Sequence, residues 1–439
     1  MTSYKQMPEE LRKICTLFEK HNFTFCLFKC EHVLEGKNKN LDLLFLHETE
    51  YNYASKLLRE QGFVLYLSEK VEKYKRMYLK FEKGIVTAVH LHREIAWHGV
   101  VILDKDLLFK RMKDNVPSVE DSLLIHAAHA LFENFKVSEL QKALLKKYRQ
   151  EAKDWKYLNF QLEKKSWKKS FYRLLNNDFT VSKGNVFRAY YSRLWNDPFS
   201  VLSLMEKGMM AIVRKISLRR RGYLIALLGP NGAGKSTTKR KVLEIYEPLT
   251  NFARGQQGYY FGWKQSVIGR ILSPLVNRSI KGKSVFEKVS EEKVKAFDLF
   301  QECLFVYIYG EYLFRYAFDI YPLLRKGKLI VCDRYFYDLN GQYPYSINSR
   351  ILPLLPFPKP NQVFILDADI ETLMKRDKTG ESTRIVKSRK NLEGQREKYQ
   401  KIGKKLKVIV LDNTKNFNKI EKKIVDSSWK KYVTGIQKA

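Results

Sequence analysis

Several features that define other classes of protein are scarce or missing in this chain. Its five cysteines are scattered, and Cys26 and Cys30 lack a second pair at the spacing of a zinc site, so we expect buried reduced thiols. No apolar run reaches membrane-spanning length. The first 21 residues carry charges where a secretory signal requires an apolar stretch. These absences predict a cytoplasmic protein with no transmembrane segment.

Acidic residues are also in short supply. The 439 residues include 81 lysines and arginines but only 47 aspartates and glutamates, which gives a formal charge of +34. Such a charge attracts polyanions of any kind, including nucleic acids, acidic membrane surfaces and phosphorylated substrates. Because the lysines are spread over the whole chain, the charge does not favour nucleic acid over the other partners.

The chain does contain enough apolar material for more than one domain. Apolar residues make up 44% of it, and 439 residues exceed what one hydrophobic core usually serves. We predict an α+β domain over 1–145, a basic helical connector over 146–218 and an α/β domain over 219–439. In the first, Ser118 and Asp121 have the spacing of a helix capping box. In the second, the last apolar helix face could lie on a membrane, although packing on a neighbouring domain is commoner.

The pattern after Tyr223 is strand, glycine turn, helix. The segment YLIALL is a continuous apolar run, as in a central parallel strand, and three later runs, KLIVCD, QVFILD and KVIVLD, each end on an aspartate. Strands that alternate with helical segments predict a doubly wound parallel sheet, in which ligands bind at the carboxyl ends of the strands.

A phosphate-binding loop follows the first of these strands. The sequence GPNGAGKS fits the pattern G-x-x-x-x-G-K-[ST] between a buried strand and a helix. In such a loop, backbone N–H groups surround the β-phosphate of ATP, Lys235 reaches the β- and γ-phosphates from outside the core, and Ser236 ligates Mg²⁺. The residues predicted to bind ATP here are Gly229, Asn231, Gly232, Ala233, Gly234, Lys235, Ser236 and Thr237.

A second candidate site follows the strand KLIVCD. Asp333 comes directly after buried apolar residues, where it could hold Mg²⁺ or orient the attacking oxygen. Arg334, next to it, suits bidentate binding of an acceptor phosphate. We therefore predict metal binding by Ser236 and Asp333, and catalytic roles for Lys235, Asp333 and Arg334.

Residues 220 to 439 resemble the thymidylate kinase family, whose features appear here in family order. They are the phosphate-binding loop, Asp333-Arg334-Tyr335, the segment PKPNQVFILDADIETLMKRDK, and Arg396 with Tyr399. The resemblance implies a nucleoside monophosphate kinase fold, with Arg376 binding ATP. It also implies a lid, in which Arg384 and Arg389 would bring positive charge onto the transferred phosphoryl group and Gly380 would serve as a pivot.

Two departures from the family leave the acceptor open. The arginine-glutamate-proline segment that grips the acceptor nucleotide is replaced by NFARGQQGYYFGWKQ, and Phe336, Tyr337 and Asp338 follow Asp-Arg-Tyr. We expect an ATP-dependent kinase for a nucleoside monophosphate or a related small acceptor, and the oligomeric state is open. One alternative is a kinase for a sugar or glycan intermediate, whose ring would suit Tyr259, Tyr260, Phe261 and Trp263. The other is an ATP-dependent switch that binds nucleic acid.

The N-terminal region resembles nucleotidyltransferase-like domains. Asn40, Asp42 and His90 stand where those enzymes place three metal-binding acids, so only one acid is present and we expect a substrate-holding or structural role. His90 and His92 share one strand face, and His126 and His129 share one helix face. Either pair could bind metal, but without further ligands a structural role is commoner.

Overall fold

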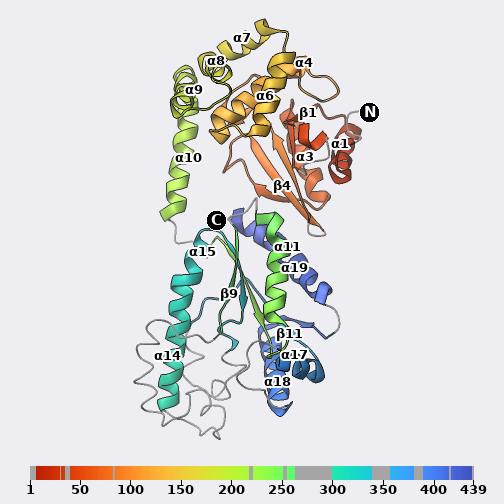
Figure 1. Ribbon diagram of the computed structural model, residues 1–439, viewed down its shortest axis with the longest axis vertical. Coiled ribbons are helices and arrows are strands. Elements are labelled where there is room, and N and C mark those ends of the chain that lie inside the picture. The colour runs from red at the N-terminus through yellow and green to blue at the C-terminus, as the bar shows by residue number, and fades with distance from the viewer. Residues whose placement is uncertain are drawn as a thin grey trace. The chain divides into compact units, whose positions relative to one another are not determined.

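The computed structural model describes residues 6–29, 31–34, 40–82, 85–216, 221–250, 255–262, 299–338, 356–379, 389–414 and 417–437. The chain divides into two compact units, Met1–Ser217 and Leu218–Ala439. Each unit contains a five-stranded sheet with helices packed on it (Figure 1). Within the described ranges, every helix is too short or too polar to cross a membrane.

The sheet of the first unit has the strand order β1-β2-β5-β4-β3, in which β2 and β5 are parallel and the other neighbours antiparallel. The strands are β1 (Phe25–Phe28), β2 (Asn40–Phe45), β3 (Val64–Leu67), β4 (Lys75–Glu82) and β5 (Ile85–His92), with a small hairpin of β6 (Ala96–Trp97) and β7 (Val100–Val101). The helices are α1 (Glu9–Lys20), α2 (Glu31–Leu34), α3 (Glu48–Glu60), α4 (Lys105–Arg111), α5 (Val119–His129), the π-helix η1 (Ala130–Asn134), α6 (Glu139–Glu151), α7 (Trp155–Lys164), α8 (Lys168–Asn176), α9 (Lys183–Asn196) and α10 (Pro198–Ile216). The predicted α+β class is confirmed.

Two hydrophobic clusters cover the two faces of this sheet. Successive side chains of a strand point to opposite faces, so Leu41 and Leu43 of β2 pack with α1 and α3, whereas Leu44 packs with α5 to α8. Asp42 has the same parity as Leu44 and therefore lies on the face that α5 covers. The predicted cap of α5 is also confirmed, because Ser118 Oγ accepts a hydrogen bond from the backbone N–H of Asp121 at 3.1 Å.

Residues on both sides of position 145 share one core. Leu158, Trp167 and Phe171 of the helical region belong to the same buried cluster as Phe28 and Leu44 of the sheet. The apolar side chains at the end of this region are exposed, including Leu202, Met205 and Met209 of α10. The packing of the apolar face of α10 on a neighbouring domain stays a prediction. The domain boundary after residue 145 also stays a prediction.

The sheet of the second unit has the order β12-β11-β8-β10-β9, and every neighbouring pair is parallel. The strands are β8 (Tyr223–Leu228), β9 (Gln256–Tyr260), β10 (Leu329–Asp333), β11 (Gln362–Asp367) and β12 (Ile409–Asp412). The helices are α11 (Lys235–Thr250), α14 (Leu299–Arg315), the π-helix η2 (Tyr316–Ile320), α15 (Tyr321–Arg325), α17 (Ile370–Thr379), α18 (Arg389–Leu406) and α19 (Phe417–Gln437). The predicted doubly wound parallel sheet is confirmed.

Helices cover both faces of this sheet (Figure 1). One face packs against α14, η2 and α15, through a buried cluster that includes Leu224 and Ile330 of the strands. On the other face α11 packs with α19, where Tyr246 and Ser428 share a hydrogen bond of 2.6 Å. Because all five strands are parallel, their carboxyl ends meet at one edge, which is where the phosphate-binding loop begins.

Candidate functional site

The phosphate-binding loop joins β8, the central strand of the parallel sheet, to α11. Gly229 has φ 141°, and a Cβ atom there would lie 2.1 Å from the carbonyl oxygen of Leu366. Gly232 has φ 77°, and its Cβ would lie 2.7 Å from the carbonyl oxygen of Leu373. Both positions combine a left-handed backbone with a close backbone approach, so only glycine fits them without strain. The loop is therefore pressed against β11 and α17.

Lys235 is the first residue of α11, and its side chain turns back over the loop. Its Nζ donates to the carbonyl oxygens of Gly229 at 2.9 Å and Pro230 at 2.8 Å. The sequence predicts a lysine outside the core, but the residue is only 6% exposed. The difference arises because the loop wraps around the lysine stem, which no pattern of residue types reveals.

Ser236 and Asp333 meet at the carboxyl edge, as their predicted shared metal site requires. The Ser236 hydroxyl donates to Asp333 Oδ2, and Lys239 Nζ lies 3.9 Å from the same oxygen. Asp333 is the last residue of β10, next to β8 in the sheet, and is 1% exposed. A hydroxyl and a carboxylate at the start of a helix form an oxygen donor set of the kind that Mg²⁺ prefers.

Arg334 adopts a left-handed backbone conformation, with φ 73°, that sends its side chain toward the loop. One guanidinium nitrogen donates to Asn231 Oδ1 at 2.6 Å, and the other pairs with Asp338. The hydroxyl of Tyr399 donates to the other oxygen of Asp338. Burial lowers the pKa of Arg334, but Asp338, with smaller contributions from Tyr399, Tyr260 and Asp333, outweighs burial and holds the pKa above the usual value.

Asp338 is the residue of this site that the sequence reasoning missed. It stands four residues after Arg334, and this short separation, with opposite charges, is the one signal that could have indicated the pair. The sequence assigns Arg334 to an acceptor phosphate, whereas the structure gives it a buried carboxylate partner.

Arg376 is tied to the loop through Asn413. It donates to the backbone carbonyl oxygen of Asn413 at 3.0 Å, and the Asn413 amide donates to that of Ala233 at 2.7 Å. Asn413 directly follows β12, and a polar residue at the end of a parallel strand is the sequence signal that could have placed it beside the loop. Arg396 contacts both oxygens of Asp367 through its Nε at 2.9 Å.

The two predicted lid arginines have different outcomes. Arg389 is exposed and pairs with Glu371 at 3.0 Å and Glu393 at 3.1 Å. Arg384 and the pivot Gly380 lie outside the described residues. The lid stays a prediction.

The aromatic residues proposed for a sugar ring are only partly available. Phe261 is fully buried and stacks on Tyr335, with ring centroids 5.1 Å apart, so it belongs to the core. The Tyr259 hydroxyl donates to Asp319. Tyr260 is 47% exposed, and Trp263 lies outside the described residues. Among the described members of this set, Tyr260 offers the most open ring.

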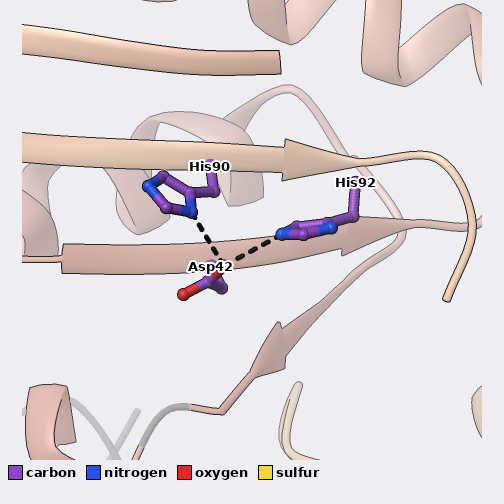
Figure 2. Close-up of side chains that lie close together, drawn as sticks. All are labelled: Asp42, His90 and His92. Atoms are coloured by element: carbon purple, nitrogen blue, oxygen red, sulfur yellow. Dashed lines mark hydrogen bonds and ion pairs between the residues drawn. The ribbon is translucent and has the colours of Figure 1, made fainter. Parts of the chain in front are cut away.

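A separate charged cluster lies within the first unit. Figure 2 shows the carboxylate of Asp42 on β2 between the imidazoles of His90 and His92 on β5. His90 Nδ1 lies 3.0 Å and His92 Nε2 2.9 Å from the same oxygen, Asp42 Oδ1. The parallel register explains this arrangement, because Asp42 is paired with His90 and Leu44 with His92. The resemblance to nucleotidyltransferase-like domains already groups Asp42 with His90, and the structure adds His92 to them.

The charge of Asp42 is already balanced in this cluster. The three side chains offer ligand atoms within 4.8 Å of one another, as a metal site would require, but Lys29 Nζ lies 3.7 Å from Asp42 Oδ1. Burial raises the pKa of Asp42, yet Lys29, His90 and His92 together outweigh burial and leave the pKa well below its usual value. Burial lowers the pKa of His92 to about 4. The imidazole of His92 is therefore neutral near pH 7, and the positive partner of Asp42 is a lysine.

His126 and His129, the second predicted pair, have separate partners. His126 Nε2 lies 2.9 Å from Glu31 Oε1, and His129 Nε2 lies 2.9 Å from Glu133 Oε2. In the described ranges, Asp42, His90 and His92 are the group placed to share a metal ion, and this helix pair is not part of it. The resemblance of the first unit to nucleotidyltransferase-like domains stays a prediction.

Comparisons with known proteins concern the second half of the chain. Residues 281–424 match the family model "Thymidylate kinase". A probable thymidylate kinase of Pyrococcus horikoshii is 28% identical over 163 residues, which cover 36% of this chain and 71% of that protein. One of Sulfurisphaera tokodaii is 23% identical over 210 residues, covering 46% and 93%. A solved thymidylate kinase from Ehrlichia chaffeensis covers 47% of this chain and 97% of its own at 16% identity, with a TM-score of 0.30.

The family match begins after the phosphate-binding loop and ends within α19. Asp333, β10, β11 and β12 lie within the matched residues, whereas β8, the loop and Ser236 precede them. The sequence resemblance is confirmed for this half of the chain, and it supports an ATP-dependent phosphotransferase. The second unit is a thymidylate-kinase-like P-loop domain.

Proposed function

We propose that the chain is a kinase that transfers the γ-phosphoryl group of ATP to a small acceptor at the carboxyl edge of the parallel sheet. The observation that carries this proposal is the contact between Ser236 and Asp333 directly beside the phosphate-binding loop. It joins a helix N-terminus, which favours anions, to an oxygen donor set that suits Mg²⁺. Phosphoryl transfer needs mainly positioning and charge stabilisation, and the described residues can supply both.

Each residue has a distinct task in this proposal. The loop backbone and Lys235 would hold the β- and γ-phosphates of ATP, and Ser236 with Asp333 would hold Mg²⁺, whose positive charge would offset the charge that develops on the phosphoryl group. Asp333 also orients the acceptor oxygen. Asn231 and Asn413 keep Arg334 and the loop in place through hydrogen bonds of 2.6 Å and 2.7 Å. Arg376 supports Asn413 and would border the bound nucleotide.

Two classes of small acceptor fit this site. The names of the similar proteins favour a nucleoside monophosphate, since thymidylate kinases act on thymidylate. Sugars and glycan intermediates are the second class, favoured by the exposed ring of Tyr260.

The proposal is tested by incubating the full chain with Mg-ATP and a panel of nucleoside monophosphates, nucleosides, sugars and oligonucleotides. Phosphorylated products are identified by mass spectrometry and ADP is quantified. We expect ADP formation that depends on one small acceptor and disappears in Lys235→Ala. Stimulation of ATP hydrolysis by oligonucleotides, with no phosphorylated product, would instead indicate a nucleic-acid-dependent switch.

A further inference from the structure

The charge of Arg334 is balanced within the protein. Its guanidinium pairs with Asp338 and donates to Asn231 at 2.6 Å. Asp338 is 2% exposed, and the Tyr399 hydroxyl donates to its second oxygen, so the carboxylate is fixed on both sides. Burial and two donors keep this carboxylate beside Arg334, rather than allowing it to swing into solvent. The pair therefore presents a net charge near zero to anything that binds there.

Other arginines near this edge of the sheet are also engaged. Arg315 donates to the carbonyl oxygens of Gly262 and Tyr260 at 2.7 Å each. Arg396 is held by Asp367, and Arg376 donates to backbone carbonyl oxygens. A phosphate group that approached Arg334 would meet the Asp338 carboxylate at close range, and like charges in a buried setting repel strongly.

We propose that the acceptor presents a hydroxyl group and no phosphate to Arg334, as a neutral sugar or another polyol does. This inference rests on the proposed kinase function and names its substrate class. A guanidinium balanced by a carboxylate donates well to hydroxyl oxygens, while the pair as a whole does not attract a dianion.

The ring of Tyr260 supports the same class of acceptor. It is 47% exposed, at the end of β9, which is paired with β10. A Cβ atom built on Gly262 would lie 2.3 Å from the Tyr260 hydroxyl and 2.7 Å from Arg334 Cδ, so both side chains pass close to this glycine. An open aromatic face beside a hydrogen-bonding guanidinium offers a sugar ring both a stacking surface and a donor.

The reaction balances with groups already assigned. The acceptor hydroxyl oxygen forms a bond to the γ-phosphorus of ATP while the bond from that phosphorus to the β,γ-bridging oxygen breaks. The bridging oxygen keeps the electron pair and leaves as part of ADP, and the hydroxyl proton passes to the Asp333 carboxylate. A phosphate acceptor would need no such proton transfer, whereas a hydroxyl acceptor does.

The test measures what a phosphate group adds to binding. Isothermal titration calorimetry with the full chain and Mg-ADP compares two matched pairs, glucose with glucose 6-phosphate and thymidine with thymidine monophosphate. In the wild type we expect no gain from the phosphate within either pair. Asp338→Asn removes the negative charge and should tighten binding of the phosphorylated members alone by about 10- to 100-fold, the value of one charge-assisted contact. Asp338→Ser provides a second variant if the first does not fold.

Tyr399→Phe is the matched control, because it removes one hydrogen bond to Asp338 but leaves the carboxylate. It should keep the wild-type ratio within each pair. The inference is overturned if the wild type binds a phosphorylated member tenfold more tightly than its partner, or if neither Asp338 variant gains affinity for phosphate. Failure of the kinase proposal is distinguishable, since it would show as no binding of Mg-ATP and no ADP formed with any acceptor.

Discussion

The two sheets of this protein each carry a buried aspartate on a strand with a parallel neighbour, but at different places along that strand. In the second unit, Asp333 is the last residue of the parallel strand β10 and lies beside the phosphate-binding loop that follows β8. In the first unit, Asp42 lies inside β2, on the face covered by helices, where Lys29 balances its charge and His90 and His92 are hydrogen-bonded to it. Both carboxylates are buried, but Asp333 faces the start of α11 beside the phosphate-binding loop, whereas Asp42 has its partners on the covered face of its sheet.

From this difference we expect Asp333 of the second unit to act in catalysis and Asp42 of the first unit to contribute to the stability of the fold.

Removing the lysine of the loop should damage function most. Lys235→Ala should lower kcat/KM for the best acceptor by about 10²- to 10³-fold, the usual cost of one group that stabilises transition-state charge. Because Lys235 also bonds two loop carbonyl oxygens, the free energy of unfolding should fall by about 1–3 kcal/mol. Steady-state kinetics and thermal denaturation measure the two effects. Arg240→Ala, an exposed cation on the same helix, is the control, and equal losses in both variants would contradict the role of Lys235.

The first unit should instead show its charged cluster in the pH dependence of stability. Unfolded histidine binds a proton below about pH 6.5, while folded His92 has a pKa of about 4. Between these values the unfolded state holds more protons, so stability is complete above pH 6.5 and is lost as the pH falls toward 4. The loss attributable to His92 is about 3 kcal/mol. Asp42, with its lowered pKa, acts at still lower pH.

Denaturant unfolding of the full chain at several pH values measures this slope. His92→Asn should reduce the slope of stability against pH between pH 6.5 and 4, relative to the wild type. An unchanged slope in His92→Asn would mean that His92 is not buried in its neutral form.

Replacing the carboxylate of the predicted metal site should have a smaller effect on the rate and should raise the Mg²⁺ concentration that the enzyme requires. Asp333→Asn keeps the hydrogen bond from Ser236 but removes the negative charge of the donor set, so we expect a rate lower by at least about tenfold and a higher Mg²⁺ concentration at half-maximal rate. Kinetics over a range of Mg²⁺ concentrations measure both. Asp412→Asn, which alters a carboxylate that contacts Thr414, serves as the control, and its Mg²⁺ dependence should match the wild type.

For the first unit we expect no nucleotidyltransferase activity. The three positions Asn40, Asp42 and His90 contain a single acid, and that acid is paired with a lysine and two histidines. The full chain should therefore transfer no nucleotide to an acceptor in the presence of metal, and Asn40→Asp should not restore transfer. Incorporation of a labelled nucleotide, retained in Lys235→Ala, would show that the first unit is catalytic.

The two units also differ in how much of their structure can be predicted from the sequence. In the second, the apolar runs and the loop motif predict the parallel sheet and the meeting of Ser236 with Asp333, because a loop after one strand and an acid after its neighbour must share an edge. The burial of Lys235 and the pair of Arg334 with Asp338 depend on side-chain directions that motifs do not record. In the first, the helix cap at Ser118 is local and predictable, but the contact of Asp42 with His90 and His92 depends on which strands pair and in which register.

The central claim is that ATP binds at the loop of the second unit and not at the charged cluster of the first. Calorimetric titration of Mg-ATP into the wild type, Lys235→Ala and Asp42→Asn tests it most directly. We predict one site in the wild type, affinity lower by about tenfold or more in Lys235→Ala, and wild-type affinity in Asp42→Asn. Wild-type affinity in Lys235→Ala, together with lost binding in Asp42→Asn, would contradict the account.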